Sequence, residues 1–124
     1  PQASQIVYGC MGLGGGWSDA PTEEKDVKQA QHIIETCLEN KINTFDLADI
    51  YTFGKAEEVF GQVLKSTPSL RKHIVLQTKV GIKLTPTHEV KQYDLSPAWI
   101  TSALHSSLKR LHSENVDILF LHRP

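Results

Sequence analysis

The sequence predicts an α/β fold in which parallel strands alternate with helices. Four runs of β-forming residues begin near residues 6, 43, 74 and 116, and three amphipathic helical patterns separate them. The fourth run is almost continuously apolar, which is typical of a parallel strand covered on both faces. Intervals of roughly 31 to 42 residues fit a (β/α)8 barrel, which has about 31 residues per unit. An open doubly wound sheet has the same local pattern, so periodicity alone leaves both folds possible.

The first strand and helix follow from the opening third of the chain. Residues 6–8 form a short β-rich run, and the glycine-rich residues 9–16 close it. Thr22 offers a helix N-cap, with Glu23 and Glu24 as acids in the first turn. The helix then ends near residue 40. Its apolar positions recur at helical spacing: Val27, Ala30, Ile34, Cys37 and Leu38.

The second unit begins with a strand over residues 43–48, whose far end turns polar. A second amphipathic helix follows, and Pro68 marks the segment that ends it. One face of this helix carries Ala56, Val59, Phe60, Val63 and Leu64.

The third unit has its strand at residues 74–80, and a long connection over residues 84–95 follows it. Ser96 then supplies an N-cap, with Pro97 at the first helical position. Residues 116–121 form the fourth strand. The third helix is expected to bury Ile100, Ala103, Leu104, Leu108 and Leu111.

The composition is that of a soluble globular protein, with 40% hydrophobic and 22% charged residues. The chain has 13 basic and 14 acidic side chains, and a net charge of -1 provides no field for nucleic acid. Cys10 and Cys37 form neither a CxxC pair nor a disulfide framework, so we expect a reducing, cytoplasmic compartment. Residues 1–9 lack the pattern of a signal peptide, and no apolar run could span a membrane. We therefore expect no membrane or nucleic-acid partner.

The glycine-rich loop does not match a dinucleotide fingerprint. Trp17 stands where the G-x-G-x-x-G pattern needs its last glycine, and no G-K-[ST] follows. The loop is either a mobile connection or a segment whose backbone approaches a ligand closely. Trp17 itself either lines an apolar substrate pocket or simply packs against its neighbours.

Ionisable side chains follow three successive strands. Asp46 and Tyr51 come at and after the second strand, Lys79 near the end of the third, and His122 at the end of the fourth. The carboxyl ends of parallel strands form the functional face in barrels and open sheets, so the four side chains should share one rim. Each residue alone could be structural, but together they indicate a site.

These groups suit proton transfer to a carbonyl oxygen. The phenol of Tyr51 has an ordinary pKa of about 10, and a neighbouring ammonium such as Lys79 lowers the pKa of a phenol. Asp46 would hold Lys79, and His122 could hydrogen-bond the substrate oxygen. Reduction of a carbonyl also needs a hydride, which no side chain supplies, so a nicotinamide cofactor is implied.

Three segments resemble the aldo-keto reductases, and bacterial members of that family in particular. They are NTFDLADIY at residues 43–51, QTKVG at residues 77–81 and LFLHRP at residues 119–124. The resemblance implies a (β/α)8 barrel that uses NADPH to reduce a small-molecule carbonyl, without a Rossmann domain. It also implies the following roles: Tyr51 as general acid, Lys79 and Asp46 as groups that lower its pKa, and His122 as the residue that positions the substrate carbonyl. Gly9, Cys10, Met11 and Asp46 are expected at the nicotinamide end.

Two departures from the family pattern leave the substrate open. Leu47 stands where many members have a small residue, and residues 52–55 lengthen the approach to the second helix. The resemblance covers residues 1–124 as the N-terminal half of a barrel, with four strands and three helices. Most contacts with the adenosine phosphate come from the family's second half, so we expect the rest of the barrel to be missing here. The outer strands should then expose apolar surface.

Other functions remain possible on the sequence. The same fold could serve as a non-catalytic nicotinamide-binding sensor subunit, or Lys79 could be the Schiff-base amine of an aldolase. His105 and His112 share a helix face, but no carboxylate-rich or HExxH pattern accompanies them, so we expect no metal.

Overall fold

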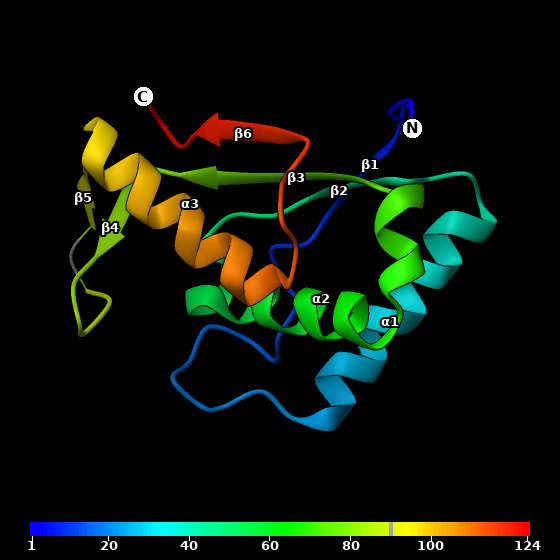
Figure 1. The fold of residues 1–124 in the computed structure, drawn as a ribbon. Helices are drawn as coiled ribbons and strands as arrows, with labels where there is room; N and C mark the ends of the chain where they lie inside the picture. Colours follow the sequence, from blue (N-terminus) through cyan, green and yellow to red (C-terminus); the bar gives the residue numbers. More distant parts are fainter. Residues whose placement is uncertain (90) are drawn as a thin grey trace.

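A computed structural model describes residues 1–89 and 91–124 of the chain, and its centre is a four-stranded parallel sheet (Figure 1). The strands lie in the order β1-β2-β3-β6. Their bounds are β1 (Val7–Gly9), β2 (Thr44–Asp46), β3 (Val75–Val80) and β6 (Ile118–Leu121). The strand order follows the chain order, as in a barrel wall, and does not reverse at a switch point as in a doubly wound sheet.

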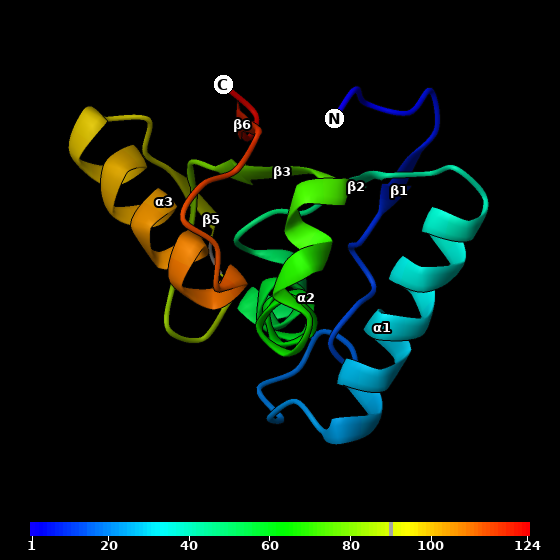
Figure 2. The ribbon, with the colours of Figure 1, turned by 45° about the vertical axis from the view of Figure 1, so that its right-hand side comes forward.

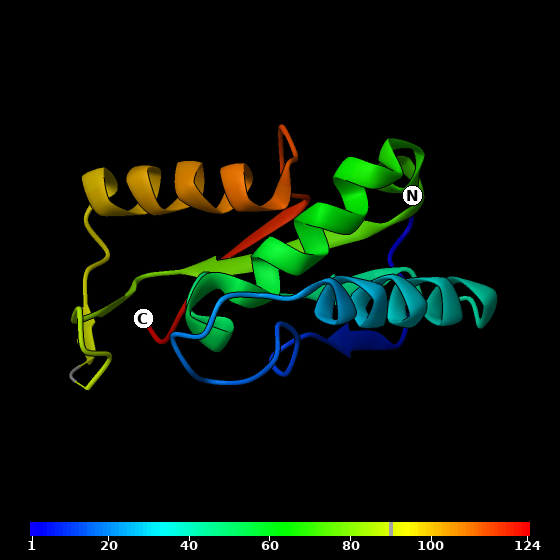
Figure 3. The ribbon, with the colours of Figure 1, turned by 90° about the horizontal axis from the view of Figure 1, so that it is seen from below.

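Three helices cover one face of this sheet (Figures 2 and 3). They are α1 (Glu24–Glu39), α2 (Lys55–Ser66) and α3 (Pro97–Leu111), and α2 packs against both others. The hydrophobic core lies between this helical layer and the sheet. Its largest fully buried apolar side chains include Phe45, Phe60, Ile34, Leu47, Ile74, Leu76 and Leu111.

The start of α1 differs from the sequence prediction. Glu23, and not Thr22, is the N-cap residue, and the backbone N–H of Glu23 donates to Asp26 Oδ2 at 2.8 Å. The carboxylate three residues into the helix can reach back to the cap, which fixes the helix start one residue later. The predicted cap of α3 is confirmed, because Ser96 Oγ accepts from the backbone N–H of Trp99 at 3.2 Å.

The apolar stripe of α3 is only partly as predicted. Ala103 and Leu111 are buried, whereas Ile100, Leu104 and Leu108 are half-buried. Two 3-10 segments follow β2 and α2, namely η1 (Tyr51–Gly54) and η2 (Pro68–His73). The second begins at Pro68, so α2 ends where expected. No helix in the described residues is long and apolar enough to cross a membrane.

The long connection after β3 contains two strands that the sequence did not predict. β4 (Ile82–Leu84) and β5 (Lys91–Tyr93) pair in antiparallel register, with Ile82 opposite Tyr93. They form a hairpin beyond the end of β3, beside the first turns of α3 (Figure 1). The hairpin brings the tip of the connection close to the glycine-rich loop.

The expectation that the fourth strand is covered on both faces is wrong. Ile118, Phe120 and Leu121 of β6 are 37%, 44% and 44% exposed. The reason is the sheet order, because β6 lies at one edge and pairs only with β3. At the other edge Val7 of β1 is 44% exposed, so the predicted apolar edges are confirmed.

Candidate active site

Four ionisable side chains gather at the carboxyl ends of the strands. Asp46 is the last residue of β2, Lys79 lies one residue before the end of β3, and His122 follows β6. Tyr51 opens η1, a short way beyond β2. Parallel register aligns these strand ends, so residues far apart in the sequence reach one rim.

Lys79 and Asp46 form the fixed centre of this rim. Lys79 Nζ lies 2.7 Å from both carboxylate oxygens of Asp46, and it also donates to the carbonyl oxygen of Leu47 at 2.8 Å. Gln77 Nε2 donates to Asp46 Oδ1 at 2.8 Å. Three acceptor oxygens thus engage the amino group of Lys79 and fix its position at the rim.

Tyr51 and His122 complete the arrangement. Lys79 Nζ lies 4.8 Å from the centroid of the Tyr51 ring. The Tyr51 and His122 rings are 6.2 Å apart and meet at 90°. The structure thus brings together all four of the predicted side chains, while their chemical roles stay a prediction.

An unusual backbone segment holds Tyr51 in place. Thr52 and Phe53 have φ of 47° and 59°, in the left-handed region that non-glycine residues seldom adopt. Thr52 is fully buried, and its Oγ1 donates to the carbonyl oxygen of Leu13 at 2.6 Å. Thr52 therefore joins the segment after Tyr51 to the glycine-rich loop. Sequence reasoning missed Thr52, because strained φ values depend on tertiary contacts that no local pattern reports.

The proposed cofactor contacts lie at the same end of the sheet. Gly9 pairs with Asp46, and the backbone N–H of Cys10 donates to the carbonyl oxygen of Asp46 at 2.9 Å. Apart from Gly9 and its two chain neighbours, no heavy atom of the described residues lies within 4 Å of the position where Gly9 would carry a Cβ. Met11 is 56% exposed, whereas the Cys10 thiol is buried in the core, and burial raises its pKa. Gly9 thus has open space around its Cα and Met11 is largely exposed, at the end of β1 that pairs with Asp46.

The glycine-rich loop meets the tip of the β4–β5 hairpin beside this rim. Trp17 packs edge-on against Phe53, with ring centroids 5.3 Å apart. Phe53 stacks on His88 at 3.9 Å, and His88 Nε2 lies 2.9 Å from Asp19 Oδ1. Trp17 remains 48% exposed, so it both packs and presents ring surface. His88, in the connection between β4 and β5, therefore contacts both η1 and the glycine-rich loop.

A buried carboxylate that sequence reasoning did not single out joins three elements. Glu57 of α2 is fully buried and accepts from Thr78 Oγ1 at 2.9 Å, Ser107 Oγ at 3.1 Å and Arg110 Nε at 3.0 Å. These bonds fasten α2 to β3, one residue from Lys79, and to α3. The only sequence signal was an acidic residue at the same helical positions as Phe60 and Leu64.

The negative charge of Glu57 affects the pKa of a second carboxyl group, that of Asp49. Burial and the negative charge of Glu57 raise the pKa of Asp49 to about 7, although Arg110 acts in the opposite direction. The Asp49 carboxyl is therefore neither fully ionised nor fully protonated near neutral pH.

The described residues hold no group of three or more His, Cys, Asp or Glu side chains that could bind a metal ion. His105 is exposed on α3, and His112 is the C-cap residue of that helix, with φ of 49°.

Comparisons with known proteins agree with the architecture. The family model described as "Aldo/keto reductase family" matches residues 5–124. The chain is 35% identical to "Uncharacterized oxidoreductase YcsN" of Bacillus subtilis over 99% of its length, covering 40% of that protein. It is 38% identical to "6-dehydroglucose reductase" of Agrobacterium fabrum, again over 99% of its length, covering 41% of that protein. The chain thus spans about two fifths of these relatives.

Solved structures give the same result. The "aldo-keto reductase AKR11C1 from Bacillus halodurans (holo form)" matches with a TM-score of 0.77 and 34% identity, over 97% of this chain and 36% of that one. The "glycerol dehydrogenase AKR11B4 from Gluconobacter oxydans" matches with a TM-score of 0.81 and 29% identity, over 98% of this chain and 36% of that one. The four strands and three helices are therefore part of a (β/α)8 barrel, as predicted. The chain belongs to the aldo/keto reductase family.

Proposed function

We propose that the protein carrying this chain reduces aldehydes or ketones to alcohols with NADPH, and that Tyr51 is the general acid. The contact that carries the proposal is the Lys79–Asp46 pair at 2.7 Å, with Lys79 Nζ 4.8 Å from the Tyr51 ring centroid. A phenol beside a fixed ammonium is suited to giving up a proton, because the positive charge stabilises the negative charge left on the phenol oxygen. Membership of an oxidoreductase family supports this assignment.

Each of the four residues has its own role in the proposed reaction. Tyr51 donates its proton to the carbonyl oxygen, and Lys79 stabilises the resulting phenolate while Asp46 keeps Lys79 charged and in place. His122, whose ring lies 6.2 Å from the Tyr51 ring, donates a hydrogen bond to the carbonyl oxygen and orients it. The nicotinamide, when bound, supplies the hydride that the carbonyl carbon gains. One hydride at carbon and one proton at oxygen convert the carbonyl to an alcohol.

The nicotinamide end would be held by Gly9, Cys10, Met11 and Asp46. Gly9 has open space around its Cα, and Cys10 would position this segment, because its thiol is buried and its backbone N–H binds the carbonyl oxygen of Asp46. Trp17 would cover the substrate from the glycine-rich loop. The remaining part of the barrel would supply most of the contacts with the adenosine phosphate, so residues 1–124 alone should bind NADPH weakly. We place the protein in the cytoplasm, with a small carbonyl compound as its partner.

Replacement of one hydroxyl tests the proposal. In the complete protein, Tyr51→Phe removes the proton donor and keeps the ring, so aldehyde-dependent consumption of NADPH should fall to the background rate. Binding of NADPH, followed by its fluorescence, should change little. Tyr93→Phe, at a tyrosine that is 53% exposed, is the matched control and should keep full activity. If Tyr51→Phe turns over like the unaltered protein, Tyr51 is not the acid.

A second function is a nicotinamide-binding sensor without turnover. The observation that favours it is 32% identity, over 99% of this chain, to "Probable voltage-gated potassium channel subunit beta" of Oryza sativa. A sensor would bind NADPH tightly and turn over negligibly with every member of a panel of small aldehydes. Measurable steady-state reduction by the complete protein would decide for the enzyme.

A further inference from the structure

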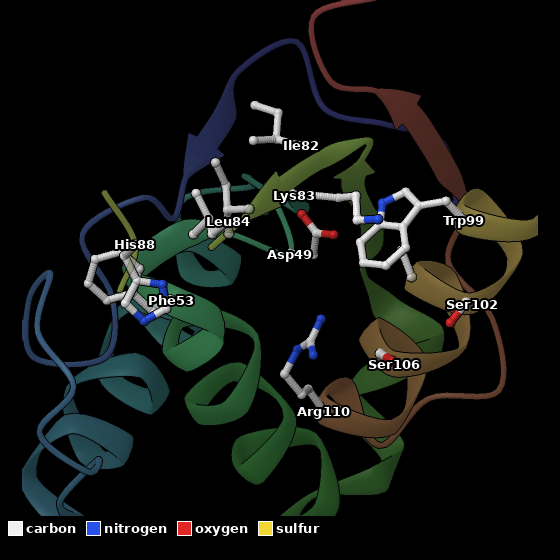
Figure 4. Close-up of a pocket in the computed structure, with 12 residues that line it drawn as sticks. Asp49, Phe53, Ile82, Lys83, Leu84, His88, Trp99, Ser102, Ser106 and Arg110 are labelled. Carbon is white, nitrogen blue, oxygen red and sulfur yellow. The ribbon is translucent and has the colours of Figure 1, made fainter. Parts of the chain in front are cut away.

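A stacked pair of side chains, Phe53 and His88, lies between a cavity and the glycine-rich loop. The cavity, of about 230 Å³, is enclosed by the β4–β5 hairpin, η1 and α3, and its described lining includes none of the four side chains of the rim. Figure 4 shows Phe53 and His88 together on the side of the cavity away from Trp99. The same pair also lines a second hollow, whose other side is formed by residues 18–22.

The ring of Phe53 is held by two other rings. One face of it stacks on the imidazole of His88, with centroids 3.9 Å apart and planes 8° from parallel. Trp17 meets it edge-on, with centroids 5.3 Å apart and planes at 88°. His88 is fixed in turn, because its Nε2 lies 2.9 Å from Asp19 Oδ1. Stacked and edge-to-face pairs are the favoured geometries of aromatic rings, so Phe53 has one preferred position here.

The backbone at Phe53 is fixed as well. Thr52 is fully buried, and its Oγ1 lies 2.6 Å from the carbonyl oxygen of Leu13 and 2.7 Å from that of Tyr51. The backbone N–H of Phe53 donates to the carbonyl oxygen of Ile50 at 2.9 Å. The left-handed φ of 59° at Phe53 is unfavourable for a residue with a side chain, so these contacts maintain it.

Lys55 holds the glycine-rich loop on either side of Trp17. A Cβ on Gly14 would lie 2.6 Å from the Cβ of Lys55, so the loop backbone lies directly against the start of α2. Six residues further along the chain from Gly14, the carbonyl oxygen of Ala20 accepts from Lys55 Nζ at 3.3 Å. The backbone around Trp17 is thus anchored at both ends, and the contact with Phe53 sets the orientation of the Trp17 ring.

The Trp17 ring lies within reach of a small molecule bound at Tyr51. The ring that it contacts belongs to Phe53, whose Cα is two residues from that of Tyr51 and so at most about 7.6 Å away. Trp17 is 48% exposed, so part of its ring surface remains open beside the contact with Phe53. An open indole ring offers a flat apolar surface, which suits another aromatic ring better than a short alkyl chain.

We propose that Phe53 is a positioning residue that determines substrate specificity by setting the orientation of the Trp17 ring. Held in this way, Trp17 favours carbonyl compounds that carry an aromatic ring over short aliphatic ones. Phe53 acts through Trp17 and takes no part in proton transfer. This inference rests on the proposed reduction at Tyr51 and adds the substrate class that the site prefers.

The ratio of kcat/KM for benzaldehyde to kcat/KM for propanal tests the proposal in the complete protein. Phe53→Leu should lower this ratio at least about fivefold, through a higher KM for benzaldehyde, because contacts with an apolar substrate group are worth that much. The kcat for propanal should stay within about twofold. Phe53→Tyr keeps the ring and should keep the ratio. An equal loss for both aldehydes would make Phe53 merely structural, and either that result or an unchanged ratio would overturn the proposal.

A double substitution tests whether Phe53 acts through Trp17. Trp17→Leu should lower the ratio about as much as Phe53→Leu does, and combining the two should lower it by less than about a further twofold. Independent, multiplying losses would show that Phe53 acts without Trp17, contrary to the proposal. Tyr93→Leu, at a 53% exposed aromatic residue of β5, is the matched control and should keep the ratio. Thermal unfolding of each variant verifies that it is folded.

A binding measurement without turnover separates this proposal from the catalytic one. The protein is labelled with 5-fluorotryptophan, and the ¹⁹F signal of Trp17 is assigned with Trp17→Phe. Benzaldehyde, added with NADP⁺ so that no hydride is available, should shift this signal saturably both in the unaltered protein and in Tyr51→Phe. The shift should need at least about fivefold more benzaldehyde in Phe53→Leu. No shift in the unaltered protein, or the same shift in Phe53→Leu, would reject the role of Phe53 whether or not Tyr51 is the acid.

Discussion

Replacement of Asp49 by Asn should stabilise the protein, and the gain should grow as the pH rises. Burial and the neighbouring Glu57 raise the pKa of the Asp49 carboxyl from 3.8 to about 7 in the folded state, and Arg110 only partly offsets this. A folded carboxyl with a raised pKa binds more protons than the unfolded one, so stability falls as the pH rises between these two values. Asn has the shape of Asp but does not titrate, so it escapes this loss.

The size of the effect follows from the shift of the pKa. A change from 3.8 to about 7 is worth about 4 kcal/mol when Asp49 is ionised in both states, at about 1.4 kcal/mol for each pKa unit. Part of this loss has already occurred at about pH 5, because the unfolded carboxyl is ionised there. The stability difference between Asp49→Asn and the unaltered protein should therefore increase by about 2.5 kcal/mol between about pH 5 and about pH 8.

Urea unfolding at the two pH values measures this difference directly. The control is Glu35→Gln, which removes an exposed carboxyl on α1 and should give the same small difference at both pH values. Linkage makes the comparison specific, because effects of the substitution on packing are present at both pH values and cancel. An Asp49→Asn difference that stays within about 0.5 kcal/mol across this range would show that Asp49 titrates near its ordinary pKa, contrary to the electrostatics above.

Three further substitutions test the hydrogen bonds of Glu57, the contact between α2 and α3, and the role of Lys79. Glu57→Ala leaves buried partners without their carboxylate and should lower the free energy of unfolding by about 3–5 kcal/mol in urea, whereas exposed Glu58→Ala should cost under about 1 kcal/mol. Gly61→Ala places a methyl group against the backbone of α3 and should cost about 3 kcal/mol or more by thermal unfolding, whereas Gly12→Ala, with open space around it, should cost far less. Lys79→Met should lower kcat for aldehyde reduction at least about a hundredfold in steady-state assays, and a smaller loss would remove Lys79 from proton transfer.

The order of the elements could be predicted because each one carries its own local signal. Alternating β-rich runs and amphipathic stripes are properties of short windows, and Ser96 and Pro97 specify a helix start within a few residues. The start of α1 was predicted one residue too early, because the local sequence favours Thr22 as the cap and does not show that the Asp26 carboxylate binds the backbone N–H of Glu23. The exposure of β6 was predicted from its place at the edge of a partial barrel, whereas its apolar sequence alone favoured a strand covered on both faces.

Some residues of the site could likewise be predicted from the sequence, and others could not. Asp46, Lys79 and His122 could be placed on one rim from the sequence, because parallel strands present their carboxyl ends together. The β4–β5 hairpin and the stacking of His88 on Phe53 could not, since both depend on contacts between distant segments. Glu57 was missed for the same reason.

The sequence by itself determined the α/β class, the succession of four strands and three helices, and the four side chains at the strand ends. Hydrophobic periodicity is a property of short sequence windows, and strand direction follows from the order of the elements, so both can be inferred from the sequence. Only the tertiary structure decided that Lys79 is held by Asp46 beside the Tyr51 ring, and that Asp49 and Trp99 line a separate cavity. Hydrogen bonds, burial and pKa shifts depend on distances between segments far apart in the chain, and folding alone sets those distances.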